Sequence, residues 1–177
     1  MTCIIGLKQK GIIWFGHDRS ATTKQGWKGP IVNEKALRIL DVDGLPWIIG
    51  GAGEILQLQL IESQMTLPGD SSERKNNLVL YLMRNFVPKL RDCLRGQGAM
   101  SKSKKGRDRA LCDLMIGVSG QICTLDEDFQ IIVSGDSYTA IGSGSDTALG
   151  ALGGTKGLIS DPEKRITCAL RVTSKYC

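Results

Sequence analysis

The side chains that most often serve as nucleophiles or metal ligands are sparse in this sequence. His17 is the only histidine, and the six cysteines are Cys3, Cys93, Cys112, Cys123, Cys168 and Cys177. No two cysteines form a CxxC pair, and the histidine does not stand at zinc-ligand spacing from any of them. We therefore expect buried, reduced thiols, no metal site and no cofactor.

Hydroxyl, carboxylate and amine side chains beside small residues are the remaining candidates for chemistry. They are Thr2, Asp18, Lys35 and Ser143, to which Gly50 adds a backbone N–H donor. Most of them also have an ordinary structural explanation. Asp18 can cap a turn, Ser143 can cap the helix that follows it, and Lys35 can lie on the surface. Gly50 can form a bulge at the end of a strand. Chemistry at these positions requires a fold that brings them together.

The formal charge of +5 is unevenly distributed along the chain. Basic residues crowd one stretch, with only Asp92 and Asp108 to offset them: Lys89, Arg91, Arg95, Lys102, Lys104, Lys105, Arg107 and Arg109. Glycines and serines interleave with them, which predicts a mobile, solvated loop over 95–109. No aromatic residue lies between Arg91 and Arg109 to stack on a base, so we do not expect nucleic-acid binding. Docking of an acidic partner is a weaker hypothesis for the same loop.

The hydrophobic pattern predicts the elements that would position these residues. Alternation and turn residues predict hairpins at 2–8 with 11–17, 36–42 with 45–50, and 111–118 with 121–125, and a further strand at 129–133. Helical spacing predicts helices at 55–65 and 78–94, the second kinked at Pro88, and at 145–154 and 162–175, the last beginning after Asp161. Blocks of strands therefore alternate with pairs of helices. This order indicates an α+β fold with two facing sheets and a helix pair outside each.

Length and composition are those of an ordinary globular protein. The 177 residues, 41% of them apolar, are sufficient for one domain with a sizeable core. The apolar runs are too short to cross a membrane, and residues 1–6 lack the features of a signal peptide. We therefore expect a cytoplasmic protein that does not bind membranes.

Five short segments occur in the order of a known family. They are Met1–Leu7, Gly16–Thr22, Glu34–Ile39, Ile49–Gly53 and Ala140–Ser145. Together they resemble the proteasome β subunits and the heat shock locus V peptidase, and in style the small bacterial and phage proteasome-like proteins. The resemblance spans nearly the whole chain. It implies the four-layer αββα sandwich of N-terminal-nucleophile hydrolases, as a single domain over 1–177.

The resemblance also implies a threonine-type peptidase, in which removal of the first methionine exposes Thr2. A threonine hydroxyl is a weak nucleophile, and the free α-amino group of the same residue can serve as its base. Asp18 would keep Lys35 charged, and that charge would favour the deprotonated oxygen of Thr2. The Gly50 N–H would donate to the oxyanion of the tetrahedral intermediate, and Ser143 would help to relay the proton.

Substrate and partners follow from the same resemblance. The substrate would be a peptide or an unfolded protein, bound in a mostly apolar pocket that favours cleavage after apolar residues. The residues of that pocket would be Ala21, Thr22, Asn33, Leu37, Ile48 and Ala52. The family further implies self-assembly into a ring or another homo-oligomer, and it leaves room for an ATPase unfoldase as a partner.

One departure from the family pattern keeps a second hypothesis open. The family places an aspartate after its last helix, where it supports the serine of the Gly-Ser-Gly motif. Aligned on Ala169–Val172, this chain has Lys175 at or near that place, and it stops at Cys177. A catalytically silent structural or interaction subunit with the same fold is therefore the alternative to a peptidase.

Overall fold

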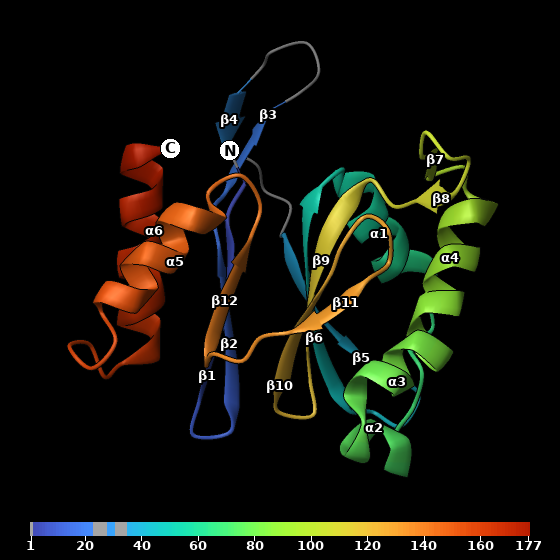
Figure 1. Ribbon diagram of the computed structural model, residues 1–177, viewed down its shortest axis with the longest axis horizontal. Helices are drawn as coiled ribbons and strands as arrows, with labels where there is room; N and C mark the ends of the chain where they lie inside the picture. The colour runs from blue at the N-terminus through green and yellow to red at the C-terminus, as the bar shows by residue number, and fades with distance from the viewer. Residues whose placement is uncertain (1, 23–27, 31–34) are drawn as a thin grey trace.

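Two β-sheets face each other in the middle of the molecule, and helices cover the outer face of each sheet (Figure 1). The computed structural model that shows this arrangement describes residues 2–22, 28–30 and 35–177. The order of the layers is helix, sheet, sheet, helix. The four-layer αββα sandwich expected from the sequence is therefore confirmed.

The first sheet is antiparallel and has the strand order β12-β1-β2. Its strands are β1 (Ile4–Gln9), β2 (Ile12–His17) and β12 (Tyr138–Ile141). β1 and β2 form the hairpin that the sequence predicted. After β2 the chain continues into a two-stranded ladder of β3 (Ser20–Thr22) and β4 (Lys28–Pro30). Because β1 is the central strand, the Thr2 that precedes it lies between the ends of β2 and β12.

The second sheet is also antiparallel and has the order β11-β10-β9-β6-β5. Its strands are β5 (Ala36–Leu40), β6 (Pro46–Gly53), β9 (Cys112–Val118), β10 (Gln121–Leu125) and β11 (Ile131–Val133). The turns predicted between β5 and β6 and between β9 and β10 are confirmed. Gly44 and Gly120 in these turns have φ values of 76° and 70°, which glycine adopts without steric cost.

The first sheet is covered by α5 (Ser145–Gly154) and α6 (Pro162–Tyr176). α6 begins as predicted, because the Asp161 side chain accepts a hydrogen bond from the Lys164 N–H at 3.1 Å. The two helices pack on β1 through a cluster of buried residues: Cys3, Ile5, Leu7, Ala140, Ala148, Leu152, Ile166 and Ala169. This packing fixes the strand that leads back to Thr2.

Four helices cover the second sheet: α1 (Ile55–Gln64), α2 (Ser72–Asn76), α3 (Leu78–Tyr81) and α4 (Val87–Gly96). The π-helical turn Leu82–Phe86 joins α3 to α4, just before the kink predicted at Pro88. Proline has no N–H for the regular bond four residues back, and a wider turn accommodates that loss. No helix in the described ranges is long and apolar enough to cross a membrane.

The space between the sheets is filled by Ile4, Ala52, Met115, Ile122 and Ile141. A separate and larger cluster joins the second sheet to its helices, and in it Trp47 stacks on Phe86 with ring centroids 5.6 Å apart. Side chains alternate between the two faces of a strand. In β6 the odd-numbered residues therefore face the helices, and the even-numbered residues face the other sheet.

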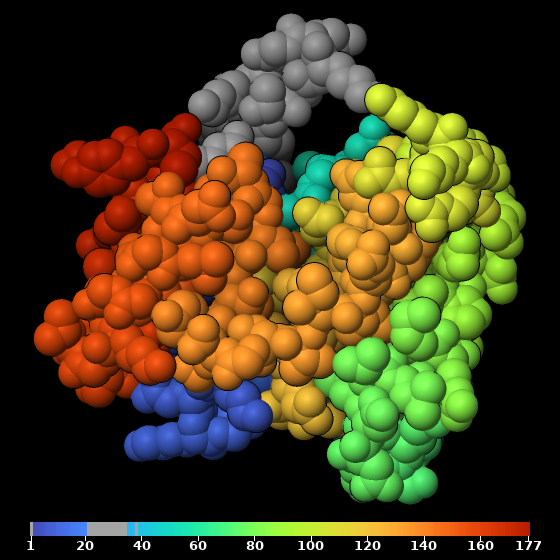
Figure 2. Space-filling model, in the orientation of Figure 1, coloured from blue at the N-terminus to red at the C-terminus, as the bar shows by residue number. Residues whose placement is uncertain are grey.

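The basic segment forms a small hairpin where the sequence predicted a solvated loop. β7 (Ser101–Lys102) pairs with β8 (Asp108–Arg109), and Figure 2 shows this hairpin at a corner of the molecule. Asp108 accepts hydrogen bonds from Arg95 at 3.0 Å and from Lys102. These charged contacts join residues from different segments, which a local composition pattern does not reveal.

Candidate active site

An edge of the first sheet meets an edge of the second where β2 lies beside β5. Asp18 follows β2 and Lys35 precedes β5, so this meeting brings the two side chains together. The Lys35 Nζ lies 3.0 and 2.9 Å from the two Asp18 carboxylate oxygens. It also donates to the backbone carbonyl of Ser20. Lys35 is only 3% exposed, and a buried ammonium stays charged only with such partners.

Thr2 lies next to this ion pair. The Lys35 Nζ is 3.4 Å from the Thr2 Oγ1. Two backbone contacts hold the chain end in place: the Asp18 N–H donates to the Cys3 carbonyl at 3.1 Å, and the Cys3 N–H donates to the Asp18 carboxylate at 2.6 Å. The ammonium charge is therefore within hydrogen-bonding distance of the threonine hydroxyl.

The loop after β12 closes the other side of Thr2. The Thr2 N–H donates to the Ser143 Oγ at 3.0 Å, and the Gly144 N–H donates to the Thr2 carbonyl at 3.1 Å. Gly142 has a φ of 94°, and a Cβ at this position would lie 2.4 Å from the Thr2 carbonyl oxygen. Glycine is therefore required for this close approach. The pairing of Ile4 with Ile141 sets the register that brings the loop to Thr2.

The Asp18 carboxylate is the acceptor at the centre of the site. Burial by itself raises the pKa of this carboxyl, but hydrogen bonds outweigh burial and hold the pKa below its usual range. The donors are the Ser20 hydroxyl at 2.5 Å, the Cys3 N–H, the Lys35 ammonium and the Ser20 N–H at 3.0 Å. Asp18 is therefore ionised at neutral pH and keeps the ammonium compensated.

Sequence reasoning missed Ser20. A serine two residues after an aspartate is a common turn pattern, so its spacing carried no functional signal. In the structure its hydroxyl and N–H both donate to Asp18, and its carbonyl accepts from Lys35. Ser20 therefore contacts both members of the ion pair.

The ladder of β6 does not favour Gly50 as the oxyanion donor. The Gly51 N–H donates to the Lys35 carbonyl at 3.0 Å, which places it on the side of β5. Backbone groups point alternately to the two sides of a strand, so the Gly50 N–H points to β9, where Met115 lies opposite. A donor directed into the second sheet cannot reach an oxyanion beside Thr2. The role of Gly50 therefore stays a prediction that this ladder does not favour.

Gly53 differs from Gly50 in the direction of its backbone N–H. The N–H of the next residue, Glu54, donates to the Leu111 carbonyl at 3.1 Å, on the β9 side. Gly53 therefore points its N–H the other way, beyond the last ladder bond to Lys35. Its φ is 141°, and a Cβ would lie 2.4 Å from the Leu111 carbonyl oxygen, so glycine is required here. The oxyanion donor on β6 therefore stays a prediction, with Gly53 as a second candidate beside Gly50.

The predicted substrate-contacting residues do not share one pocket. Leu37 packs against the cluster between the second sheet and its helices, whereas Ala52 lies between the sheets. Ile48 lines a cavity of about 520 Å³ with Ile12 and Ile13, toward the β1–β2 turn. Strand alternation places Leu37 on the helix side of the second sheet and Ile48 and Ala52 on its other side, which the sequence-based set did not take into account.

Two further members of that set belong to the β3–β4 ladder. Ala21 and Thr22 belong to β3, directly after Ser20. Asn33 lies outside the described residues. The position of β3 after Asp18 places its backbone close to the Thr2 site, while its contribution to a pocket stays a prediction.

Lys175 stands at or near the position that the family pattern gives to an aspartate. It lies in the last turn of α6, with its Nζ 5.0 Å from the centroid of the Tyr176 ring. Within the described ranges, the Ser143 Oγ makes hydrogen bonds only with Thr2, to its N–H at 3.0 Å and its carbonyl at 3.5 Å. No carboxylate of that part of the chain supports this hydroxyl.

No family model and no curated protein matches this sequence. Solved structures do match it. BPH from Thiobacillus denitrificans has a TM-score of 0.76 at 17% identity, over 99% of this chain and 90% of that one. The complex of that protein with epoxomicin has a TM-score of 0.66 at 17% identity, over 99% of this chain and 91% of that one. Eukaryotic HslV from Trypanosoma brucei has a TM-score of 0.63 at 20% identity, over 99% of this chain and 91% of that one.

Identities this low leave activity open, but the agreement covers almost all of each chain. It includes both sheets and both helical layers in one arrangement. The chain therefore has the proteasome β-type fold that characterises the HslV-like N-terminal-nucleophile hydrolases.

Proposed function

We propose that this protein is a threonine-type peptidase whose nucleophile is Thr2, exposed by removal of Met1. The observation that carries the proposal is the distance of 3.4 Å between the Lys35 Nζ and the Thr2 Oγ1, with Asp18 paired to the same ammonium. The attraction within a buried ion pair is largely offset by the free-energy cost of removing both charges from water, so the pair contributes little to stability. Such a pair beside a hydroxyl is better explained by chemistry at that hydroxyl.

In the proposed reaction, the Thr2 oxygen attacks the carbonyl carbon of a peptide bond. Its proton passes to the Thr2 α-amine, next to the Ser143 hydroxyl, and then to the nitrogen of the departing peptide. A C–O bond forms as the C–N bond breaks, which leaves an ester that water hydrolyses. The Lys35 ammonium stabilises the developing alkoxide, and the Gly53 N–H donates to the oxyanion.

Substrates in this proposal are peptides or unfolded proteins, and 1–177 acts as a single domain in the cytoplasm. Self-assembly into a ring or another homo-oligomer is part of the proposal, with an ATPase unfoldase as a further partner. Large exposed apolar side chains gather on β2 and around the β5–β6 turn: Ile12, Trp14, Leu40, Val42 and Leu45. Such exposure supports assembly, because monomers rarely expose extended apolar patches.

Epoxomicin is a suitable probe, because it is a peptide epoxyketone that a threonine with a free amine can attack. Intact-mass spectrometry of the purified protein should show loss of Met1, and then one added inhibitor per chain. Thr2→Ala should abolish the adduct and the hydrolysis of an apolar peptide. Thr167→Ala, an exposed threonine on α6, is the matched control and should change neither. Quantitative retention of Met1, or an adduct that survives Thr2→Ala, would rule out the proposal.

A catalytically silent subunit is the second candidate function. It is favoured by the Ser143 hydroxyl, which lacks a carboxylate partner in the described ranges, and by Lys175 where the family has an aspartate. In that case the fold would serve assembly or interaction alone. A processed protein that assembles but neither reacts with epoxomicin nor cleaves peptides would establish this alternative.

A further inference from the structure

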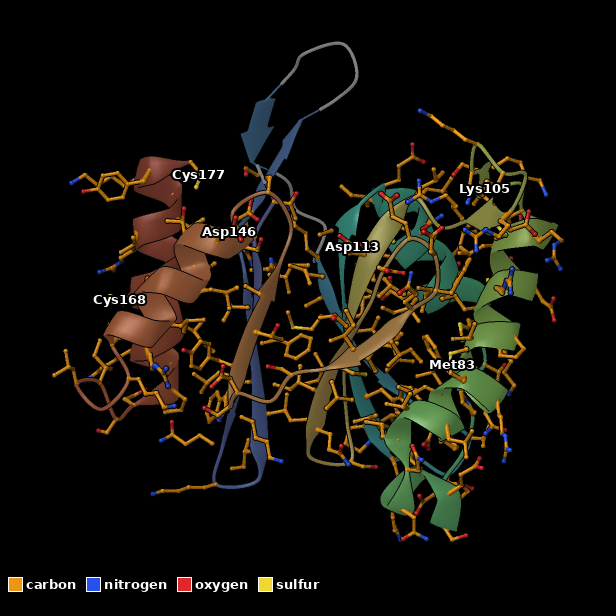
Figure 3. All side chains as sticks on the ribbon, in the orientation of Figure 1. Met83, Lys105, Asp113, Asp146, Cys168 and Cys177 are labelled. Carbon is orange, nitrogen blue, oxygen red and sulfur yellow. The ribbon has the colours of Figure 1, made fainter. Side chains whose placement is uncertain are left out.

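Four basic side chains at one corner of the molecule have no acidic partner within the described part of the chain. They are Arg91 of α4 and Lys104, Lys105 and Arg107 of the β7–β8 turn. The carboxylates nearby are engaged elsewhere, in the ion pairs Arg95–Asp92, Arg95–Asp108, Lys102–Asp108, Arg109–Glu127 and Arg109–Asp128. Figure 3 labels Lys105 at this corner, beside the hairpin. The corner therefore carries positive charge that is not compensated internally.

Arg91 adds a buried donor to this charge. Its guanidinium lies over the Phe129 ring, 4.9 Å from the centroid, and its Nε is buried without a hydrogen-bond partner. A cavity of about 450 Å³ is lined by Arg91, Lys102, Gly106, Arg107, Asp108 and Asp128. An unsatisfied buried donor is costly, and arginine donors match carboxylate oxygens in geometry and charge. A carboxylate that enters this cavity would meet the positive charge of the Arg91 guanidinium, which lines it and has no acidic partner in the described ranges.

The corner lies at the Thr2 end of the sandwich (Figure 1). β8 leads through Leu111 into β9, and the Leu111 carbonyl accepts from Glu54, the residue after Gly53. The hairpin is therefore a short distance along the chain from the strand end that borders the Thr2 site. The corner and the N-terminal end of β1 therefore lie at the same end of the molecule.

We propose that this corner, formed by Arg91, Lys104, Lys105 and Arg107, binds an acidic segment of the polypeptide that the Thr2 site cleaves. The identification of the bound chain as substrate rests on the proposed peptidase function. The cations are spread over α4 and the hairpin turn, which suits an extended chain with several carboxylates. A single-stranded nucleic acid would need an exposed aromatic ring to stack on, and Phe129 is only 4% exposed beneath Arg91.

Fluorescence anisotropy with a labelled Glu-rich peptide tests the binding step without any need for activity. Arg91→Gln combined with Arg107→Gln should weaken binding about tenfold or more, because two charge-assisted contacts are lost. Lys10→Gln combined with Lys156→Gln removes the same charge from exposed positions elsewhere and should change binding less than about twofold. Added salt should weaken binding to the unmodified protein.

Two results would overturn the binding site. One is an equal loss in the two double variants, which would mean that net charge alone attracts the peptide. The other is tighter binding of a single-stranded oligonucleotide of equal charge, which would assign the corner to another class of ligand.

A second measurement tests the substrate assignment. A fluorogenic peptide extended by a Glu-rich tract should have a kcat/KM about tenfold above its Gln-rich counterpart, and the Arg91→Gln, Arg107→Gln variant should remove that difference. Equal values in the unmodified protein would overturn the assignment. Absence of cleavage of both peptides would count against the peptidase function, whereas the anisotropy result would stand independently.

Discussion

Replacement of Lys35 by methionine should separate catalysis from folding. Lys35→Met keeps the length and apolar stem of the side chain, but it removes the ammonium 3.4 Å from the Thr2 Oγ1. Loss of one electrostatic element of this kind lowers kcat by about 10²-fold or more. Lys35→Arg should fail as well, because a planar guanidinium cannot replace a compact ammonium in a site that is only 3% exposed.

The stability effects of the two partners in the ion pair should be unequal. At 2.9 Å and an effective dielectric of about 20, the attraction between Lys35 and Asp18 is about 6 kcal/mol, most of it offset by desolvation. After Lys35→Met, the carboxylate still accepts from Cys3 and Ser20, so we expect a loss of about 1–3 kcal/mol. After Asp18→Asn, the ammonium stays buried without a carboxylate, and the loss should reach about 3–5 kcal/mol.

Urea unfolding of both single variants and the double variant measures these effects, and hydrolysis of a fluorogenic peptide measures catalysis. The double variant should lose less than the sum of the two single variants, because it removes the pair together. Wild-type kcat/KM in Lys35→Met, on chains that have lost Met1, would refute a catalytic role for the ammonium. An Asp18→Asn variant as stable as Lys35→Met would contradict the charge argument.

Three further predictions concern the surroundings of Thr2. Ser20→Ala should raise the pKa of Asp18, because a hydrogen bond to the carboxylate is lost. The stability that ionised Asp18 provides at neutral pH should then be lost at a higher pH when the protein is acidified. Urea midpoints between about pH 3 and 6 measure this change, and Ser20→Thr should restore the original pH dependence. Gly142→Ala should cost about 1–3 kcal/mol and disturb Thr2, detectable as lower stability together with loss of any epoxomicin adduct. Iodoacetamide at neutral pH should label the exposed Cys177. Burial raises the pKa of Cys3 to about 11 and of Cys112 and Cys123 to about 12, so these three thiols should react only after unfolding. Early labelling of Cys3 in a mass-spectrometric time course would contradict the structure.

Most elements of the fold could be predicted because their signals are local. The β5–β6 and β9–β10 hairpins are marked by turn glycines, Gly44 and Gly120, at positions where φ is positive. The start of α6 is marked by Asp161, whose side chain caps the helix. The β7–β8 hairpin was missed because its support is not local. Asp108 is bound by residues of α4 and β7, and no short window of sequence contains that pairing.

In the candidate site, too, some features could be predicted from the sequence and others depend on contacts between distant segments. Family resemblance selected Thr2, Asp18, Lys35 and Ser143. In the structure Lys35 contacts both Asp18 and the Thr2 hydroxyl, and Ser143 contacts the Thr2 backbone. The donor on β6 stays a prediction, because a strand presents its N–H groups alternately to two neighbours. A sequence motif does not show whether the odd-numbered or the even-numbered residues direct their N–H groups toward the site. Only the ladder bond from Gly51 to Lys35 shows which glycines face the site.

The electrostatics of the site are one-sided, and this bears on whether it can turn over substrate. On one side of Thr2, Lys35 and Asp18 form a buried ion pair that Ser20 supports, so the group that would stabilise the alkoxide is complete. On the other side, the described residues offer the Thr2 amine only the Ser143 hydroxyl. Asp18 already compensates the Lys35 charge, so the Ser143 hydroxyl is the one described side chain placed to pass a proton to or from the Thr2 nitrogen. The geometry therefore supports attack on a reactive electrophile such as epoxomicin more strongly than rapid peptide hydrolysis, because only hydrolysis requires repeated proton transfer through the amine.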